Sequence, residues 1–197
     1  MKKQLSRFRY YMSNTDVSLR ERNFVLTSLT AAVTLTIIFI WDICIGEGFF
    51  KMVTLGSAVV FLYLMTWILA KYKKIEIGSS IISLGIIFIV LPIEFFTGGG
   101  VYGCTPIWFA YAFFYIGLNL QGVLCLIHLG LLLASAIACY VISYIYPELL
   151  HMHTAGIAYL DSIASVLGVG VMLCITIRFM IRLYNRYNFT FQLSSVS

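Results

Sequence analysis

A long apolar segment near the N-terminus reads Phe24-Val-Leu-Thr-Ser-Leu-Thr-Ala-Ala-Val-Thr-Leu-Thr-Ile-Ile-Phe-Ile-Trp-Asp-Ile-Cys-Ile45. Because the hydrocarbon core of a bilayer is about 30 Å thick, a helix needs about 20 apolar residues to cross it, and this segment is long enough. It is too long for the core of a signal peptide and lacks a cleavage site of small residues. We therefore expect a retained transmembrane span.

Five further apolar segments follow, at about residues 50–70, 76–96, 106–120, 123–146 and 157–180. Unpaired backbone groups are costly in hydrocarbon, and the alternating pattern of a barrel strand is absent, so each segment is expected to be helical. The fourth would span only about 22 Å, which requires an inward-dipping loop before it or a thinner membrane. The sequence thus predicts an all-α, six-span membrane protein with a segment 1–23, a transmembrane domain 24–180 and a tail 181–197.

The composition excludes several classes of function. The chain of 197 residues is 61% hydrophobic and 11% charged, with a mean hydropathy of +0.96. Such values lie outside the range of soluble domains, and six spans leave no room for a soluble catalytic domain. Phosphate-binding loops, zinc-type cysteine patterns and nucleophile elbows are absent from the sequence, so we expect neither an enzyme nor a bound cofactor. The basic residues lie at predicted membrane boundaries, which favours lipid headgroups over nucleic acid as their partner.

Charge fixes the expected orientation. The basic residues gather on alternate connections, and only Lys51 lies on the other side: Lys2, Lys3, Arg7, Arg9, Arg20, Arg22, Lys71, Lys73, Lys74, Arg178, Arg182 and Arg186. Lys and Arg are retained in cytoplasmic connections, so both termini are expected in the cytoplasm and the protein in the cytoplasmic membrane. Five acidic residues lie at the opposite ends of the spans: Asp42, Glu47, Glu94, Glu148 and Asp161.

The glycine-rich segment between the third and fourth spans is the first candidate for a binding site. Its glycines permit positive φ angles and close approach to another group. Thr105 is expected as the N-cap of the next helix and Pro106 as its first residue, so that a helix N-terminus faces an anionic or polar ligand. Alternatively, the glycines only let the chain reverse tightly. The predicted ligand-binding residues here and in the neighbouring spans are Glu94, Gly98, Gly99, Gly100, Tyr102, Thr105, Trp108 and Asp161.

The five outer carboxylates suggest a second possibility. In a helix bundle they could ring a cavity near His151 and His153, and a cationic ligand would be their chemical match. Carboxylates and imidazoles also bind metals, but this pattern is a weak signal and no metal site is predicted. Alternatively, these acids are simply solvated, because an acidic residue at the end of a span costs much less free energy than one at its centre.

The remaining polar residues of the spans favour packing roles. Asp161, Ser162 and Ser165 form a polar edge that should face protein, and Gly168, Gly170, Ala158 and Ala164 would let another helix approach closely. His128 is expected to be a buried hydrogen-bonding residue. Cys44 and Cys104 both lie near the outer surface, and whether they pair is left open.

The last span is the expected output element. Arg178, Arg182 and Arg186 recur every four residues, so they share one face of the helix and their stems can extend past the inner headgroups. A helix that continues out of the membrane can transmit a rotation or a shift along its axis. Simple anchoring by positive charge operates in either case.

Several motifs together resemble a known family. They are Phe95-Phe-Thr-Gly-Gly-Gly-Val-Tyr102, Pro106-Ile-Trp-Phe109, Tyr146-Pro-Glu148, Asp161 and Arg182-Leu-Tyr-Asn-Arg186. The pattern resembles the six-helix membrane input region of bacterial sensor histidine kinases and diguanylate cyclases. The resemblance implies a partner in the form of a cytoplasmic output domain or a response regulator. The uncharged segment that begins at Asn188 departs from that family, which indicates either a fragment or a stand-alone module, and kinase or cyclase activity is not implied for these residues.

These observations predict a sensory module of bacterial signal transduction. It would detect an extracytoplasmic or membrane-borne small ligand and relay the signal through the sixth helix, with membrane lipid and a second copy of the chain as further partners. The alternative is the six-helix substrate-binding subunit of an energy-coupling-factor vitamin transporter, which has similar length and topology. A structural membrane partner without a ligand is a third possibility.

Overall fold

The computed structural model describes residues 19–72, 75–151 and 155–194, and no strand occurs within these ranges. The helices are α2 (Leu19–Ile45), α3 (Phe49–Tyr72), α4 (Ile75–Gly85), α5 (Leu91–Thr97), α6 (Thr105–Asn119), α7 (Gly122–Ile145) and α8 (Ala155–Ser194). A π-helical segment η1 (Ile86–Val90) joins α4 to α5, and short 3₁₀ turns η2 (Gly100–Tyr102) and η3 (Pro147–Leu149) precede α6 and α8. The all-helical prediction is confirmed for the described residues.

Five helical stretches are long and apolar enough to cross a membrane: Arg20–Ile45, Phe49–Leu69, Ile75–Thr97, Gly122–Ile145 and Gly156–Arg182. The remaining helix, α6, has 15 residues, as its short apolar segment predicted. It lies inside the bundle and packs against α2, α4, α5, α7 and α8. Its neighbours therefore cover most of α6, and its short length leaves room for the glycine-rich loop before it.

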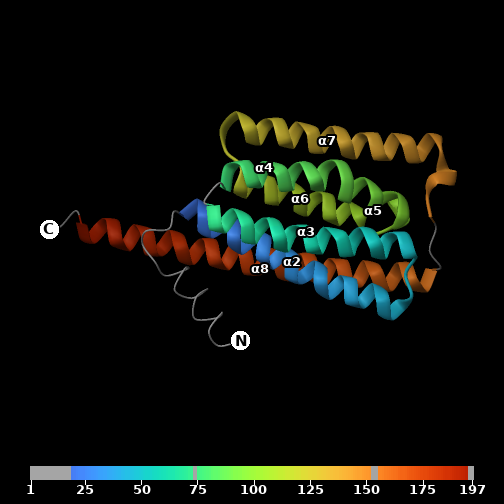
Figure 1. The fold of residues 1–197 in the computed structure, drawn as a ribbon, viewed down its shortest axis with the longest axis horizontal. Coiled ribbons are helices and arrows are strands. Elements are labelled where there is room, and N and C mark those ends of the chain that lie inside the picture. The colour runs from blue at the N-terminus through green and yellow to red at the C-terminus, as the bar shows by residue number, and fades with distance from the viewer. Residues whose placement is uncertain (1–18, 73–74, 152–154, 195–197) are drawn as a thin grey trace.

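The helices run roughly along a common axis, with α7 on one side of the bundle and α2 and α8 on the other (Figure 1). The close approach predicted for small residues occurs at Gly168 of α8. A Cβ atom added there would lie 3.1 Å from both Thr34 and Ile38 of α2. Gly170 faces open space instead, so only one of the two glycines serves this contact among the described residues.

The third span contains a local change of helical pitch at Pro92. The Leu91 N–H donates to the Ile86 carbonyl, five residues earlier. With the same five-residue spacing, the Ile87 carbonyl would accept a backbone hydrogen bond from Pro92, but proline has no N–H to donate. The hydroxyl of Ser135 on α7 donates to that Ile87 carbonyl at 2.9 Å. A side chain of the neighbouring helix thus satisfies the group that the proline leaves unpaired, which is how broken helices are tolerated in lipid.

Buried polar contacts also join the helices at other depths. The hydroxyl of Thr27 donates to Asn119 at 3.1 Å, and the hydroxyls of Ser28 and Tyr115 lie 3.0 Å apart. His128 is buried, with its Nε2 atom 2.9 Å from the Ser80 hydroxyl and its Nδ1 atom 2.8 Å from a carbonyl of its own helix. The prediction that His128 is a buried hydrogen-bonding residue is confirmed.

The last helix, α8, has 40 residues. At 1.5 Å per residue it is about 60 Å long, about twice the thickness of a bilayer core. It extends beyond the other helices at the end where the C-terminus lies (Figure 1). Arg178 and Arg182 are exposed on it, and the helix continues to Ser194 through most of the segment predicted as a tail.

Candidate functional site

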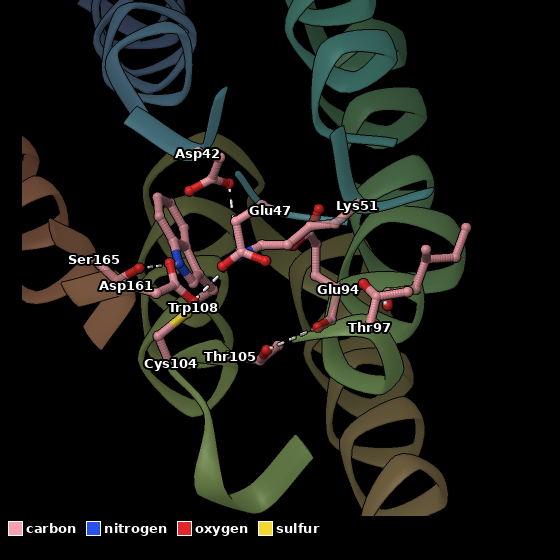
Figure 2. Close-up of polar contacts among 11 residues, drawn as sticks. Asp42, Glu47, Lys51, Glu94, Thr97, Cys104, Thr105, Trp108, Asp161 and Ser165 are labelled. Carbon is pink, nitrogen blue, oxygen red and sulfur yellow. Dashed lines mark hydrogen bonds and ion pairs between the residues drawn. The ribbon is translucent and has the colours of Figure 1, made fainter. Parts of the chain in front are cut away.

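A buried ionic cluster lies at the end of the bundle opposite the projecting end of α8. The ammonium group of Lys51 donates to Glu47 Oε1 at 3.1 Å and to Asp161 Oδ2 at 3.2 Å. Asp42 Oδ2 lies 3.6 Å from the same nitrogen. Lys51 is only 4% exposed and Asp42 is 0% exposed. Figure 2 shows that these side chains converge from α2, α3, α8 and the turn between α2 and α3. We call Asp42, Glu47, Lys51 and Asp161 the Lys51 cluster.

The turn between α2 and α3 explains why these residues meet. Gly46 has a φ of 75°, in the left-handed region that glycine adopts without strain, and the chain reverses there. The Glu47 N–H then donates to the Asp42 carbonyl at 3.0 Å. Glu47 and Lys51 are four residues apart, so their side chains lie on the same side of the chain as α3 begins.

Two side chains from the start of α6 extend this network toward α8. The Cys104 thiol donates to Asp161 Oδ2 at 3.0 Å, and the Trp108 indole N–H donates to the Ser165 hydroxyl at 3.2 Å. Burial raises the pKa of the Cys104 thiol, so the thiol stays protonated and acts as a donor. The α6–α8 contact is therefore held by one charged and one neutral hydrogen bond at the same level as Lys51.

A cavity of about 330 Å³ lies beside the Lys51 cluster. Apolar side chains of α2, α3, η1 and α6 form most of its wall, including Leu35, Leu55, Ile86 and Tyr111. Its charged lining residues are Asp42, Lys51, Glu94 and Asp161. An apolar space with a few charged groups at one place is the usual form of a small-molecule site.

Glu94 is the lining carboxylate outside the Lys51 cluster. Its Oε1 atom is inaccessible to water and has no hydrogen-bond partner among the described residues. Its position is set by the helix end: the Thr105 hydroxyl donates to the Glu94 backbone carbonyl at 3.1 Å. A buried carboxylate oxygen without a donor is costly, so this atom is a candidate contact for a ligand.

The glycine-rich segment has a steric role. Gly99 and Gly100 have positive φ angles, and a Cβ atom on Gly103 would overlap the Gly98 carbonyl oxygen. A Cβ atom on Gly98 would lie 2.6 Å from the Glu94 carbonyl oxygen. These glycines therefore permit the tight turn that carries the chain from α5 into α6. None of Gly98, Gly99, Gly100 and Tyr102 lines the cavity, and Tyr102 is 76% exposed.

Three of the other four predicted ligand-binding residues meet at the cavity. Glu94, Trp108 and Asp161 line it, although they come from three different helices. Thr105 is buried behind Glu94 and does not line it. The predicted N-cap role of Thr105 is wrong: Cys104 occupies the N-cap position, and Thr105 begins α6 and bonds the end of α5 instead. At this helix start, the Cys104 thiol donates to the Asp161 carboxylate, so an acidic group of the protein itself lies beside it.

The predicted ring of carboxylates and histidines forms only in part. Asp42, Glu47 and Asp161 gather as expected, whereas Glu148 and His151 are exposed. His153 lies outside the described residues. Cys44 and Cys104 are both free thiols, the first exposed and the second buried, so the structure contains no bond between them.

Lys51 is a residue of the candidate site that the sequence pattern does not indicate. In the sequence it stands out only as an exception to the charge bias. The available signal was the Glu47–Lys51 spacing beside Asp42, which places three charges around a single turn. The contact with Asp161 cannot be predicted from a local sequence pattern, because Asp161 is 110 residues from Lys51 in the chain.

The carboxylates of Asp42, Glu47 and Asp161 offer oxygen atoms within 4.8 Å of one another, a spacing that suits a metal ion. The Lys51 ammonium group already lies among them, however, and donates to two of the three. A divalent ion would have to share this space with a positive charge. The arrangement therefore fits an internal ion-pair network better than a metal centre.

In comparisons with known proteins, no family model, no curated protein and no solved structure matches the chain.

Proposed function

We propose that this protein is a multi-pass membrane receptor that binds a small ligand in the cavity beside the Lys51 cluster. The observation that carries the proposal is the double role of Asp161. This residue lines the cavity, and it also accepts hydrogen bonds from Lys51 of α3 and from Cys104 before α6. A ligand at this wall would change the packing of α8 against α3 and α6. Differential binding of the two packing states is what a receptor needs.

The proposal includes six membrane crossings, with both termini in the cytoplasm of a bacterial cell and the Lys51 cluster on the outer side. The buried ion pairs of Lys51 support this orientation. Three carboxylates offset the charge of Lys51. This lysine therefore does not count as an exposed cation on the outer side, where the charge rule disfavours Lys and Arg. In this arrangement α6 completes its crossing together with the glycine-rich turn.

Helix α8 would carry the signal inward, in the manner of the input regions of sensor histidine kinases and diguanylate cyclases. Two hydrogen bonds tie its first turns to the cavity wall, through Asp161 and Ser165. From there the helix is continuous to Ser194. A shift at the cavity would therefore reach the opposite end of the bundle along one rigid element.

A substrate-capturing subunit of an energy-coupling-factor vitamin transporter is the second candidate. The observation that favours it is the cavity itself, which lies between the helices and could hold a substrate for delivery. The two functions differ in what happens to α8. A receptor requires α8 to move when the ligand binds, whereas a capture subunit does not.

The test uses the purified full chain in lipid nanodiscs and a library of amphipathic small molecules. Compounds that bind the cavity should raise the apparent melting temperature, because they bind only the native state. Ala112 on α6 lines the cavity, so Ala112→Phe should abolish the shift. Ala110→Phe is the matched control, because Ala110 is exposed on the same helix. If no compound distinguishes the two variants, the cavity is not a binding site.

The relay is tested with the compounds that pass this screen. Spin labels at Tyr72→Cys on α3 and Tyr184→Cys on α8 report the distance between these two exposed positions. A receptor should show a changed distance distribution when a compound binds. Binding without such a change would favour the capture subunit.

A further inference from the structure

We infer that the ligand of this cavity is a hydrophobic amine, which places its protonated amino group near Glu94 and Asp42 and its apolar part between α2, α3, η1 and α6. This inference rests on the proposed function and specifies the chemical class of the ligand.

Charge balance is the first argument. The Lys51 cluster contains three carboxylates and one ammonium group, and Glu94 adds a fourth carboxylate to the same cavity. Lys51 already donates to Glu47 and Asp161, so it has little capacity left for a ligand. An anionic ligand would meet an excess of negative charge. A cationic group would reduce that excess, which is favourable at buried positions.

Unsatisfied oxygen atoms mark where the cation would lie. Both carboxylate oxygens of Asp42 are buried and lack a hydrogen-bond partner in the part of the chain that the structure describes, and the Lys51 nitrogen lies 3.6 Å from the nearer one. Glu94 Oε1 is likewise buried without a hydrogen-bond partner among the described residues. Asp42 and Glu94 both line the cavity. A primary ammonium group has three donors, which suits acceptors of this kind.

The rest of the lining argues for an apolar ligand body. The apolar part of the wall includes Leu35 and Ile38 of α2, Leu55 and Leu62 of α3, and Leu91 of α5. A fully polar ligand such as a sugar would leave its hydroxyl groups without partners along this wall, at a cost for each. The volume of about 330 Å³ lies at the lower end of the range for ligand pockets, so the apolar part is small.

The opening of the cavity supports a ligand that partitions into lipid. The lining residues with the greatest exposure include Phe61 of α3, at 36%, and Ile89 of η1, at 58%, on the flank of the bundle. At the end of the bundle, Glu47 and Lys51 are each only 4% exposed, so the turn covers the charges on that side. Ser57 of α3 is a further exposed lining residue, and its hydroxyl already bonds a carbonyl of its own helix. Access between α3 and α4–η1 is therefore largely apolar, and an amphipathic amine can pass through it.

The test compares three probes of equal chain length: octylamine, 1-octanol and octanoate. Each is titrated against the full chain in phosphatidylcholine nanodiscs at pH 7, where an alkylamine is protonated like a lysine side chain. The readout is the dissociation constant from calorimetry, together with the shift in apparent melting temperature relative to each variant's own baseline. Octylamine is expected to bind at least about tenfold more tightly than octanol, a difference of about 1.4 kcal/mol, and octanoate is expected to bind least.

Glu94→Gln and Asp42→Asn should each weaken octylamine binding by at least about tenfold while leaving the weak octanol binding unchanged. Glu148→Gln is the matched control, because Glu148 is an exposed carboxylate that does not line the cavity. Two carboxylate variants are used so that misfolding of one does not decide the result, and the comparison of the three probes on the wild-type chain needs no variant.

The outcomes separate this inference from the proposed function. If octanol or octanoate binds as tightly as octylamine and Ala112→Phe abolishes that binding, the cavity is a site but the amine assignment is wrong. If octylamine binding persists unchanged in both carboxylate variants, it reflects partitioning into lipid and the assignment is also wrong. If Ala112→Phe affects none of the probes in any assay, both proposals fail.

Discussion

Lys51 shows how one buried residue can hold a set of like charges together. Asp42, Glu47 and Asp161 repel one another, and the ammonium group among them makes their burial possible. Such a cluster is weak support for stability in itself, because the desolvation cost of the charges offsets much of their attraction. Its consequence is geometric: it fixes the start of α3 against α8.

Lys51→Met should destabilise the protein strongly. Removing one partner of a buried ion pair typically costs about 3–5 kcal/mol, because the remaining charges are left uncompensated. The matched control is Lys71→Met on the same helix, where the lysine is exposed and lies over Trp67. Reversible unfolding in mixed detergent micelles would measure both. A loss for Lys51→Met no greater than that for Lys71→Met would show that the cluster is not held by its lysine.

Gly103→Ala tests the turn before α6. The new Cβ atom would overlap the backbone oxygen of Gly98, which cannot rotate away, so we expect a loss of about 1–3 kcal/mol, as for other overpacked sites. Gly117→Ala is the control, because that glycine lies within α6 with open space around its Cβ position. There alanine should stabilise the helix by up to about 1 kcal/mol. Equal effects from the two changes would contradict the tight-turn description.

At the scale of the elements, the third span combines a proline, a π-helical segment and a donor from the next helix. Ser135→Ala should cost about 0.6 kcal/mol, the average for an interhelical hydrogen bond in a membrane protein. Ser143→Ala on the same helix should cost less, because among the described residues that hydroxyl bonds only a carbonyl of α7 itself. The cost of Ser135→Ala should shrink when Pro92→Ala restores a backbone donor. A double-mutant cycle of unfolding free energies would measure this coupling, and additive effects would refute it.

The proposed access route to the cavity passes the contact between α3 and α4. A Cβ atom on Gly85 would lie 3.5 Å from the Phe61 ring, so Gly85→Ala should be tolerated. The longer side chain of Gly85→Leu would fill the space beside the ring. We expect it to slow octylamine association at least about tenfold, by raising the barrier to entry about 1.4 kcal/mol. Stopped-flow fluorescence would measure the rates, with Gly85→Ala as the control, and equal rates would place the access route elsewhere.

The helices could be predicted from sequence and their meeting points could not. Apolar runs predicted the positions of all six helices, including the short α6, because each run is a local property of the chain. They did not predict the end of α8, which continues to Ser194 through a polar segment that the apolar pattern does not mark. The glycine segment was correctly identified as irregular, yet its glycines shape the turn and do not reach the cavity. Glu94, Trp108 and Asp161 were chosen for separate local reasons. Their convergence around Lys51 depends on how α5, α6 and α8 pack, and no local pattern encodes that.

At the scale of the whole molecule, the two ends of the bundle differ in kind. One end holds the Lys51 cluster with the cavity beside it, and the other holds Lys71 and the projecting part of α8. Because α8 packs against both α2 and α6, a displacement of its cavity-lining residues Asp161 and Ser165 must either move α8 or break those contacts. In the proposed receptor, the orientation of this bundle in the membrane decides which compartment supplies the ligand and which receives the signal.

Cysteine labelling would determine that orientation. In a background with the native cysteines replaced, Tyr102→Cys and Tyr72→Cys place the same substitution at two exposed positions near opposite ends of the bundle. If the basic residues remain in the cytoplasm, a membrane-impermeant maleimide added to intact cells should label position 102 and spare position 72. Permeabilised cells provide the control, because both positions should then react. Labelling of position 72 from outside would invert the bundle, place the Lys51 cluster in the cytoplasm and overturn the proposed direction of signalling, even if the cavity still bound its ligand.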